Sequence, residues 1–147
     1  MVDSDLGRTF DVIVWLFSAI GYVVAVERLQ AAVAAMARHL EPGGVLLVEP
    51  WIAPESFTLG TVHALYVDQP TLKIARISVS AVAGRVSILD FHYLVGTPEG
   101  VSQFTECHEL GLFTESEYRT AAQAAGLDTT FDPHGLTGRG LLIGVRR

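Results

Sequence analysis

Apolar runs and a helical repeat alternate over the first third of the chain. Residues 12–17 form a continuous apolar run rich in β-branched and aromatic side chains, which is typical of a strand buried on both faces of a sheet. Apolar residues then recur at helical spacing at Val26, Leu29, Val33, Met36 and Leu40. Glu41-Pro42-Gly43-Gly44 is expected to end this helix, and a second apolar run occupies residues 45–48. The pattern predicts a strand–helix–strand unit with parallel strands.

The segments that follow these two strands are candidates for a binding site. In open α/β sheets, ligands bind beyond the carboxyl ends of the strands. Those ends carry Phe17-Ser18-Ala19-Ile20-Gly21-Tyr22 and Glu49-Pro50-Trp51. Both segments hold polar or aromatic side chains, so we expect at least one of them to line a site. The alternative is a plain buried unit with incidental loop residues.

The middle of the chain changes to a period of two. Alternating apolar and polar residues predict antiparallel strands joined by short turns, at residues 63–67, 72–82, 85–95 and 101–112. A parallel unit followed by such a meander indicates the α/β class, with a β-rich insertion in an α/β core. Cys107 lies in the last of these runs, where we expect a small buried residue.

Polar residues gather on the last two of these runs. A turn symmetric about Pro98 places Asp90 opposite Glu106. One face of the sheet then holds Asp90, His92, Glu106 and His108. Three interpretations stay open: a divalent metal site, a substrate-facing wall with a histidine–carboxylate general base, and a solvated face whose opposite charges pair.

The final third begins with a clear helix start. Thr114 and Glu117 have the spacing of a capping box, and Phe113 and Tyr118 occupy the two positions of a hydrophobic staple. The helix that they begin is expected to end at Gly126.

A loop separates two closing strands, which are predicted at residues 127–131 and 141–145. In this loop Arg139 stands between two glycines, directly before the second strand. Glycines let the backbone approach a ligand closely, and arginine suits bidentate contacts with phosphate or carboxylate. Arg139 is therefore a candidate anion contact, and an exposed surface arginine is the alternative.

Composition narrows the class of protein. The chain has 147 residues, of which 50% are hydrophobic, enough for one domain with a core. The net charge of −6 and the scattered basic residues argue against binding to nucleic acid. The uncharged run at residues 12–26 is shorter than the roughly 20 residues of a spanning helix. We therefore expect a cytoplasmic protein without a membrane segment. The single cysteine excludes an internal disulfide.

The order of these elements resembles the carboxyl-terminal portion of a class I S-adenosylmethionine-dependent methyltransferase. Four stretches look like the small N-methyltransferases that act on nucleotide-linked amino sugars, as in desosamine and mycaminose biosynthesis. They are FDVIVWLFSAIGY, HLEPGGVLLVEPW, FTECHELGLFTESEY and GLTGRGLLIGV. The resemblance covers essentially all 147 residues. It implies part of a Rossmann-like sheet with an antiparallel β insertion beside a sugar-nucleotide pocket.

The resemblance also implies a cofactor, S-adenosyl-L-methionine, and a nucleotide-linked sugar as substrate, in antibiotic biosynthesis. The cofactor candidates are Met1, Leu16, Phe17 and Ser18. The substrate candidates are Tyr22, Trp51 and Arg139, with a diphosphate as the expected partner of Arg139. The catalytic candidates are His92, Glu106 and His108. No metal is expected, and a homodimer is one assembly that this reading allows.

Three parts of the chain follow from the resemblance: a partial Rossmann-like core at residues 1–50, the insertion at 51–112, and a closing helix and strands at 113–147. The family's glycine-rich cofactor loop and its acidic ribose contact have no counterpart in the sequence. We therefore expect a truncated methyltransferase, either a fragment or the product of a misassigned start. The alternatives are a non-catalytic module that associates through an uncovered sheet edge, and a metal-dependent enzyme.

Overall fold

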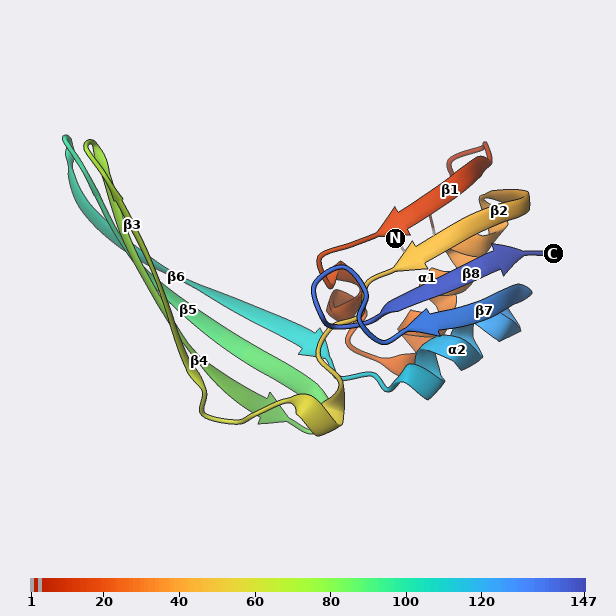
Figure 1. Ribbon diagram of the computed structural model, residues 1–147. Coiled ribbons are helices and arrows are strands. Elements are labelled where there is room, and N and C mark those ends of the chain that lie inside the picture. The colour runs from red at the N-terminus through yellow and green to blue at the C-terminus, as the bar shows by residue number, and fades with distance from the viewer. Residues whose placement is uncertain (1, 3) are drawn as a thin grey trace. The chain divides into compact units, whose positions relative to one another are not determined.

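The helices and strands follow the order that the sequence predicts, in a computed structural model that describes residue 2 and residues 4–147 (Figure 1). The elements are β1 (Phe10–Trp15), η1 (Ala19–Val23), α1 (Val26–Arg38), β2 (Leu40–Val48), η2 (Pro54–Ser56), β3 (Val62–Gln69), β4 (Leu72–Ala83), β5 (Val86–Thr97), β6 (Gly100–Gly111), α2 (Glu115–Ala124), β7 (Leu127–Asp132) and β8 (Leu141–Arg146). The α/β class is confirmed. The chain forms two units, one up to Phe57 and again from Leu110, the other from Thr58 to Glu109. No helix in the described part of the chain is long and apolar enough to cross a membrane.

The first unit contains a four-stranded sheet in the order β1-β2-β8-β7. β1 and β2 are parallel, with Ile13 opposite Leu46 and Trp15 opposite Val48, as the strand–helix–strand pattern predicts. β8 is antiparallel to both of its neighbours, so β7 runs in the same direction as β2. The carboxyl ends of β1, β2 and β7 therefore lie at one edge of the sheet, as the arrowheads in Figure 1 show.

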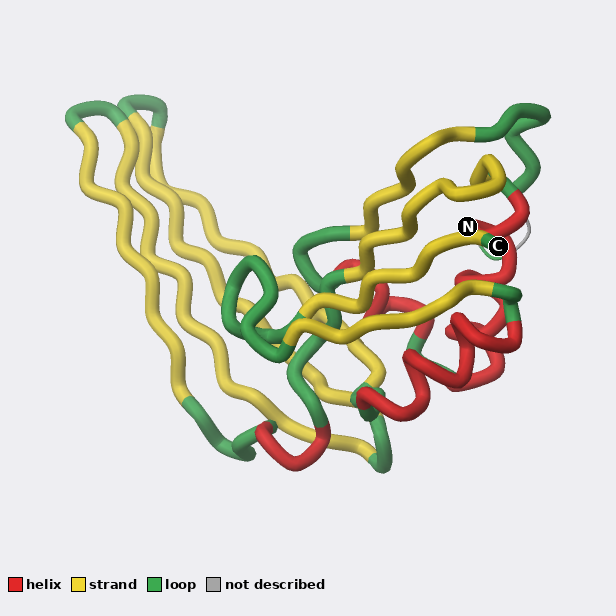
Figure 2. Tube along the Cα trace, turned by 45° about the vertical axis from the view of Figure 1, so that its right-hand side comes forward, coloured by secondary structure: helices red, strands yellow, loops and turns green. Residues whose placement is uncertain are grey.

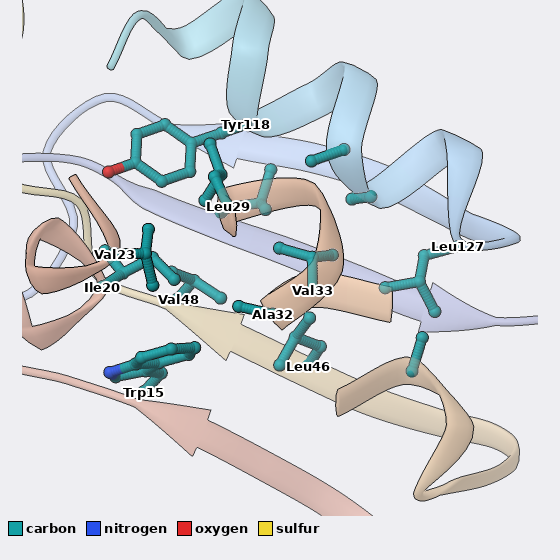
Figure 3. Packing of buried hydrophobic residues seen from close by; sticks show 14 of the residues in the cluster. Trp15, Ile20, Val23, Leu29, Ala32, Val33, Leu46, Val48, Tyr118 and Leu127 are labelled. Carbon is teal, nitrogen blue, oxygen red and sulfur yellow. The ribbon is translucent and has the colours of Figure 1, made fainter. Parts of the chain in front are cut away.

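Both helices cover the same face of this sheet (Figure 2). Their apolar side chains pack with those of the strands in one core (Figure 3), which includes Trp15, Ile20, Leu29, Val33, Leu46, Val48, Tyr118, Leu127 and Leu142. Burial of each large apolar side chain contributes about 1.5–3 kcal/mol. On the other face of β1, Val12 and Val14 are 54% and 56% exposed. The prediction that this strand is buried on both faces is wrong, because both helices pack on one side.

The Pro-Gly-Gly segment has a different role from the one predicted. α1 ends at Arg38, before the Glu41-Pro42-Gly43-Gly44 stretch that was expected to stop it. These residues instead form an irregular part of β2, where the register with β1 shifts. Gly43 has a φ of +80°, and a Cβ on Gly44 would lie 2.8 Å from the Glu41 carbonyl oxygen. The two glycines are therefore required by a β-bulge.

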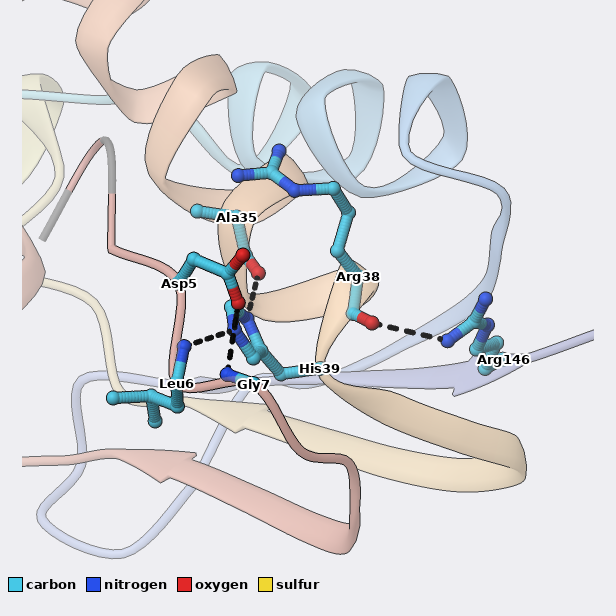
Figure 4. Close-up of polar contacts among 7 residues, drawn as sticks. All are labelled: Asp5, Leu6, Gly7, Ala35, Arg38, His39 and Arg146. Atoms are coloured by element: carbon cyan, nitrogen blue, oxygen red, sulfur yellow. Dashed lines mark hydrogen bonds and ion pairs between the residues drawn. The ribbon is translucent and has the colours of Figure 1, made fainter.

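A buried histidine fixes the end of α1 to the amino-terminal segment (Figure 4). The Nε2 atom of His39 accepts a hydrogen bond from the Leu6 backbone N–H at 2.9 Å. Since Nε2 is the acceptor, Nδ1 carries the proton and donates to the Ala35 carbonyl at 2.7 Å. Asp5 lies 3.5 Å from Nε2. The Gly7 backbone N–H donates to the Asp5 carboxylate at 2.9 Å and lowers the pKa of that carboxyl.

The predicted start of α2 is confirmed. The Thr114 hydroxyl accepts from the Glu117 backbone N–H at 3.2 Å, and the Glu117 carboxylate accepts from the Thr114 backbone N–H at 2.8 Å. The rings of Phe113 and Tyr118 meet edge to face, with their centroids 5.8 Å apart. A capping box and a hydrophobic staple therefore set the direction in which this helix leaves the loop.

The second unit is a four-stranded antiparallel sheet in the order β3-β4-β5-β6, as the alternating pattern predicts. Val62 pairs with Val79, and Ile77 pairs with His92. This register places several exposed apolar side chains on one face of the sheet, namely Val62, Tyr66, Ile77, Val79 and Leu94. The other face carries the buried Ser78, Ser80 and Ser87.

Candidate functional site

A cavity of about 400 Å³ lies at the carboxyl edge of the first sheet. Its walls come from the segment after β2, the start of α2 and the loop after β7. The lining includes four aromatic side chains, one cation and two carboxylates, namely Trp51, Phe113, Tyr118, Phe131, Arg139, Glu55 and Glu115. Its volume lies in the range of small-molecule sites, and its mixture of apolar walls with a few polar groups is typical of them.

Arg139 is held in a defined position on the wall of this cavity. Its guanidinium carbon lies 4.9 Å from the centroid of the Trp51 ring, within the range of a cation–π contact. One guanidinium nitrogen donates to the Ser18 hydroxyl at 2.9 Å. That hydroxyl is buried and donates in turn to the Pro50 carbonyl at 2.7 Å. The structure thus brings together three predicted site residues from three separate segments.

The turn after β1 has an unusual backbone. Phe17 and Ser18 have φ values of 56° and 58°, in the left-handed region that non-glycine residues rarely adopt. The Phe17 side chain is 83% exposed, whereas Ser18 is buried. Leu16 opens the turn and accepts a hydrogen bond from the Ala19 backbone N–H at 3.3 Å. Strained backbone of this kind is found preferentially at binding sites.

Glu49 belongs to one of the two predicted binding segments, although it is not among the individual candidate residues. It directly follows β2 and is 1% exposed. One carboxylate oxygen accepts from the Phe17 backbone N–H at 2.6 Å, and the other accepts from the Thr137 hydroxyl at 2.5 Å. A carboxylate placed directly after a buried strand was the available signal, because ligand contacts and buried polar groups gather at that edge.

Tyr118 also contributes to the cavity, beyond its predicted place in the staple. The side chain is 1% exposed. Burial raises the pKa of its hydroxyl, and the Trp51 backbone acts in the opposite direction. The hydroxyl therefore remains protonated and neutral at physiological pH.

Tyr22, a predicted substrate contact, does not line the cavity. It lies on η1 and is 50% exposed. Its neighbour Gly21 packs tightly, since a Cβ there would lie 2.9 Å from a methyl carbon of Leu110. Met1, which was expected near the cofactor, lies outside the described residues.

Two of the three catalytic candidates lie together in the second unit. The Nε2 atom of His108 is 3.4 Å from a carboxylate oxygen of Glu106, and both residues are on β6. The His108 ring meets Phe91 edge to face at 5.1 Å, and Tyr93 stacks on Phe104 at 4.6 Å. Glu106 and His108 therefore share the face that carries Phe91 and Tyr93.

His92 lies on the opposite face, so the predicted cluster is wrong. The Asp90 carboxylate hydrogen-bonds the thiol of Cys107 and raises the pKa of that thiol. Asp90 and His92 are two residues apart on β5 and share a face with Cys107, not with Glu106. Cys107 is exposed, which corrects the expectation of a buried residue. Among the described residues, no group of His, Cys, Asp and Glu could hold a metal ion.

The error comes from the length of one turn. β5 ends at Thr97 and β6 begins at Gly100, so the connecting turn is Pro98-Glu99. A turn centred on Pro98, as predicted, lies half a residue away from the true centre between Pro98 and Glu99. The resulting slip of one residue in register moves every side chain of one strand to the other face.

Known proteins give independent information about the chain, although no family model matches it. The dTDP-3-amino-3,4,6-trideoxy-alpha-D-glucopyranose N,N-dimethyltransferase of Streptomyces venezuelae is 44% identical over 146 residues, which cover 99% of this chain and 62% of that protein. This chain is similar to amino-sugar N-methyltransferases. The dTDP-3-amino-3,6-dideoxy-alpha-D-glucopyranose N,N-dimethyltransferase of Streptomyces fradiae is 40% identical over 99% of this chain and 57% of its own length. The predicted resemblance is confirmed.

Solved structures agree with these matches. The crystal structure of Streptomyces venezuelae DesVI superimposes with a TM-score of 0.94 at 43% identity, over 99% of this chain and 62% of that one. The structure of S-adenosylmethionine-bound CalS10, an amino pentose methyltransferase involved in calicheamicin biosynthesis, gives a TM-score of 0.90 at 41% identity and the same coverage. The Rossmann-like methyltransferase fold with an antiparallel insertion is therefore confirmed. The chain spans about three-fifths of the length of these relatives.

Proposed function

We propose that the chain forms part of an S-adenosylmethionine-dependent methyltransferase that methylates the amine of a nucleotide-linked sugar in antibiotic biosynthesis. One observation carries the proposal. Arg139 is held by Ser18 and Trp51 on the wall of a cavity at the carboxyl edge of the sheet. The chain that carries this arrangement is 44% identical to a dimethyltransferase of a dTDP-linked amino sugar.

The turn after β1 suits the methionine end of the cofactor. Leu16, Phe17 and Ser18 follow the carboxyl end of β1. Phe17 and Ser18 have left-handed backbone, and the Phe17 side chain is exposed whereas Ser18 is buried. We propose that these residues bind the cofactor there. S-adenosylmethionine supplies a methyl group on a positively charged sulfur. The family's glycine-rich loop has no counterpart in these 147 residues, so they provide only part of the cofactor's contacts.

Arg139 is proposed to bind the diphosphate of the sugar nucleotide. A guanidinium matches the geometry of phosphate oxygens and can donate two parallel hydrogen bonds. One nitrogen of Arg139 is engaged by Ser18, which orients the group and leaves the other nitrogens for the ligand. The face of the Trp51 ring packs against the guanidinium. Tyr22, half-exposed on η1, is proposed to contact the sugar part of the substrate.

Transfer of a methyl group to an amine is an in-line displacement in which the reactants are themselves reactive. The protein mainly aligns them and excludes water. The amine must lose one proton, which can also leave to solvent. His108, beside Glu106, is proposed to assist this loss without being indispensable, whereas His92 faces the other side of the sheet.

Calorimetric titration of the 147-residue chain tests the proposal. We expect binding of S-adenosylmethionine and of thymidine diphosphate, and we expect Arg139→Ala to weaken diphosphate binding by a factor of roughly 10 to 100. Arg28→Ala, on an exposed position of α1, is the matched control and should bind like the wild type. A folded chain that binds neither ligand contradicts the proposal.

A second candidate is a module that acts by association with another chain. β1 lies at the edge of its sheet, and Val12 and Val14 on it are more than half exposed. Exposed edge strands pair readily with other chains. The exposed apolar face of the second sheet also supports a homodimer. Sedimentation velocity over a range of concentrations separates the candidates, because self-association without binding of the cofactor favours this second one.

A further inference from the structure

Two loops at the cavity edge meet on one buried carboxylate. Glu49 is hydrogen-bonded to the backbone of the turn after β1 and to the side chain of the loop before β8. A carboxylate without hydrogen bonds is very costly to bury, so these two contacts favour the buried position of the side chain. The position of each loop is thereby linked to the position of the other.

The turn after β1 needs such an anchor. Left-handed backbone at two successive non-glycine residues, Phe17 and Ser18, costs on the order of 1–3 kcal/mol per residue, by the general scale for strained conformations. The Phe17 N–H, at the start of this strained pair, donates to the Glu49 carboxylate at 2.6 Å. A hydrogen bond to a charged acceptor is among the strong ones in proteins and offsets part of the strain.

The loop before β8 needs an anchor for a different reason. It has no regular structure between Asp132 and Leu141, and Gly138 and Gly140 on either side of Arg139 both have positive φ values. Such glycines leave the backbone with many alternative conformations. The bond from the Thr137 hydroxyl to Glu49 restrains the loop two residues before Arg139.

We propose that Glu49 is a positioning residue that ties the turn at Phe17 to the loop at Thr137 and so fixes the Arg139 guanidinium against Trp51. Glu49 does not touch the substrate in this scheme. It acts through Ser18, whose hydroxyl accepts a hydrogen bond from one guanidinium nitrogen of Arg139, and through the restrained loop. That the ligand of Arg139 is a diphosphate rests on the proposed function, whereas the positioning of Arg139 does not.

The chemistry of the site predicts which substitutions matter. Glutamine at this position can accept from the Phe17 N–H with its oxygen and donate to the Thr137 hydroxyl with its nitrogen. Glu49→Gln should therefore keep the arrangement. Glu49→Leu removes both contacts and leaves the turn strained. Because that variant can also fail to fold, Thr137→Val, which removes one contact from an exposed loop, is the decisive variant.

Two measurements on the full 147-residue chain test this proposal. The first is the chemical shift of the Arg139 Nε–H, which the Trp51 ring current displaces in the wild type. We expect Thr137→Val to move it toward the value of an unfolded peptide and Glu49→Gln to leave it in place. Thr130→Val, on an exposed strand position, is the control and should leave the resonance unchanged.

The second measurement is a double-mutant cycle with thymidine diphosphate as the probe. Thr137→Val should weaken binding about tenfold, the loss typical of one hydrogen bond to a charged group. In the Arg139→Ala background, the same substitution should change the affinity less than about twofold, because the guanidinium that Thr137 helps to position is absent. An equal loss in both backgrounds overturns the proposal.

The two measurements distinguish this proposal from the proposed function. If the wild-type chain binds no thymidine diphosphate, the proposed function fails, and the Arg139 resonance still decides the role of Glu49. A resonance that is unchanged in both Thr137→Val and a folded Glu49→Leu overturns the positioning role. A resonance that moves in Thr137→Val, together with tight binding of thymidine diphosphate by the wild type, supports both proposals.

Discussion

Tyr118 shows how one residue can serve the helix, the core and the site. Its ring completes the staple with Phe113, and the same ring lines the cavity beside Arg139. Its hydroxyl is completely buried, so the charged form is disfavoured. The consequence for stability can be measured at high pH.

Stability should fall at alkaline pH through Tyr118. Burial raises the pKa of its hydroxyl above the ordinary value of 10.0. Above about pH 10 the unfolded chain releases this proton while the folded chain retains it, so the free energy of unfolding falls as pH rises. The slope from this group reaches about 1.4 kcal/mol per pH unit. We expect Tyr118→Phe to remove that part of the slope in urea denaturation between about pH 9 and 11. Equal slopes in both proteins contradict the expectation.

The histidines of the second unit should have modest effects on the reaction. The amine's proton can leave to water, so His108→Ala should lower the rate of the proposed methyl transfer without abolishing it. His92→Ala, on the other face of the sheet, should leave that rate unchanged. A loss beyond roughly 10⁴-fold, comparable to that of an obligate base, contradicts this expectation. Glu106→Gln separates the contributions further, because it removes the charge beside His108 and leaves His92 on the other face untouched.

Helix α2 depends on its first turn. Thr114 and Glu117 satisfy each other's backbone N–H groups, which the helix cannot satisfy internally. We expect Thr114→Ala to lower the free energy of unfolding by about 1 kcal/mol, measured by urea denaturation at neutral pH. Thr120→Ala, at an exposed position inside the same helix, is the control and should be neutral or slightly stabilising. A similar loss of unfolding free energy in both variants would mean that the cap does not stabilise the helix.

The order and type of the elements could be predicted because they depend on local periodicity. Helical spacing in α1, alternation in β3 to β6 and the capping box of α2 are each set by neighbouring residues. Boundaries that depend on tertiary context were missed. Gly43 and Gly44 were predicted to end a helix, but they form a bulge in β2. The prediction failed because the pairing of β2 with β1 cannot be seen in the sequence of either strand.

The candidate site was predicted only in part, because local sequence signals reveal some of its residues and tertiary contacts determine the others. Trp51, Ser18 and Arg139 could be singled out by their residue type beside strand ends. Glu49 was missed because a buried carboxylate gives no periodic signal and its partners are distant in the sequence. The prediction that His92 and His108 share a face was wrong because it depended on the exact length of one turn.

At the scale of the whole molecule, uncovered apolar surface is the main feature of the first sheet. β1 is an edge strand whose Val12 and Val14 face away from the helices. We expect Val14→Lys to reduce concentration-dependent association in sedimentation velocity, since a lysine on an exposed edge strand opposes pairing. The free energy of unfolding should change little, because Val14 is 56% exposed.

A matched substitution identifies the surface. Leu136→Lys places the same charge on a residue that is 63% exposed and belongs to the loop between β7 and β8, not to β1. It should leave the association unchanged. If both variants reduce association equally, the effect is one of net charge and not of the β1 edge.

The short turn Pro98-Glu99 constrains how the second sheet can vary during evolution. Which side chains stand on which face depends on whether the number of residues between two positions is odd or even. An insertion of one residue at the start of β6 would exchange Glu106 and His108 with Cys107 and its neighbours, whereas a paired insertion would preserve the surface. Descendants of this sequence should therefore change the faces of the second sheet by substitution, or by gaining and losing residues two at a time.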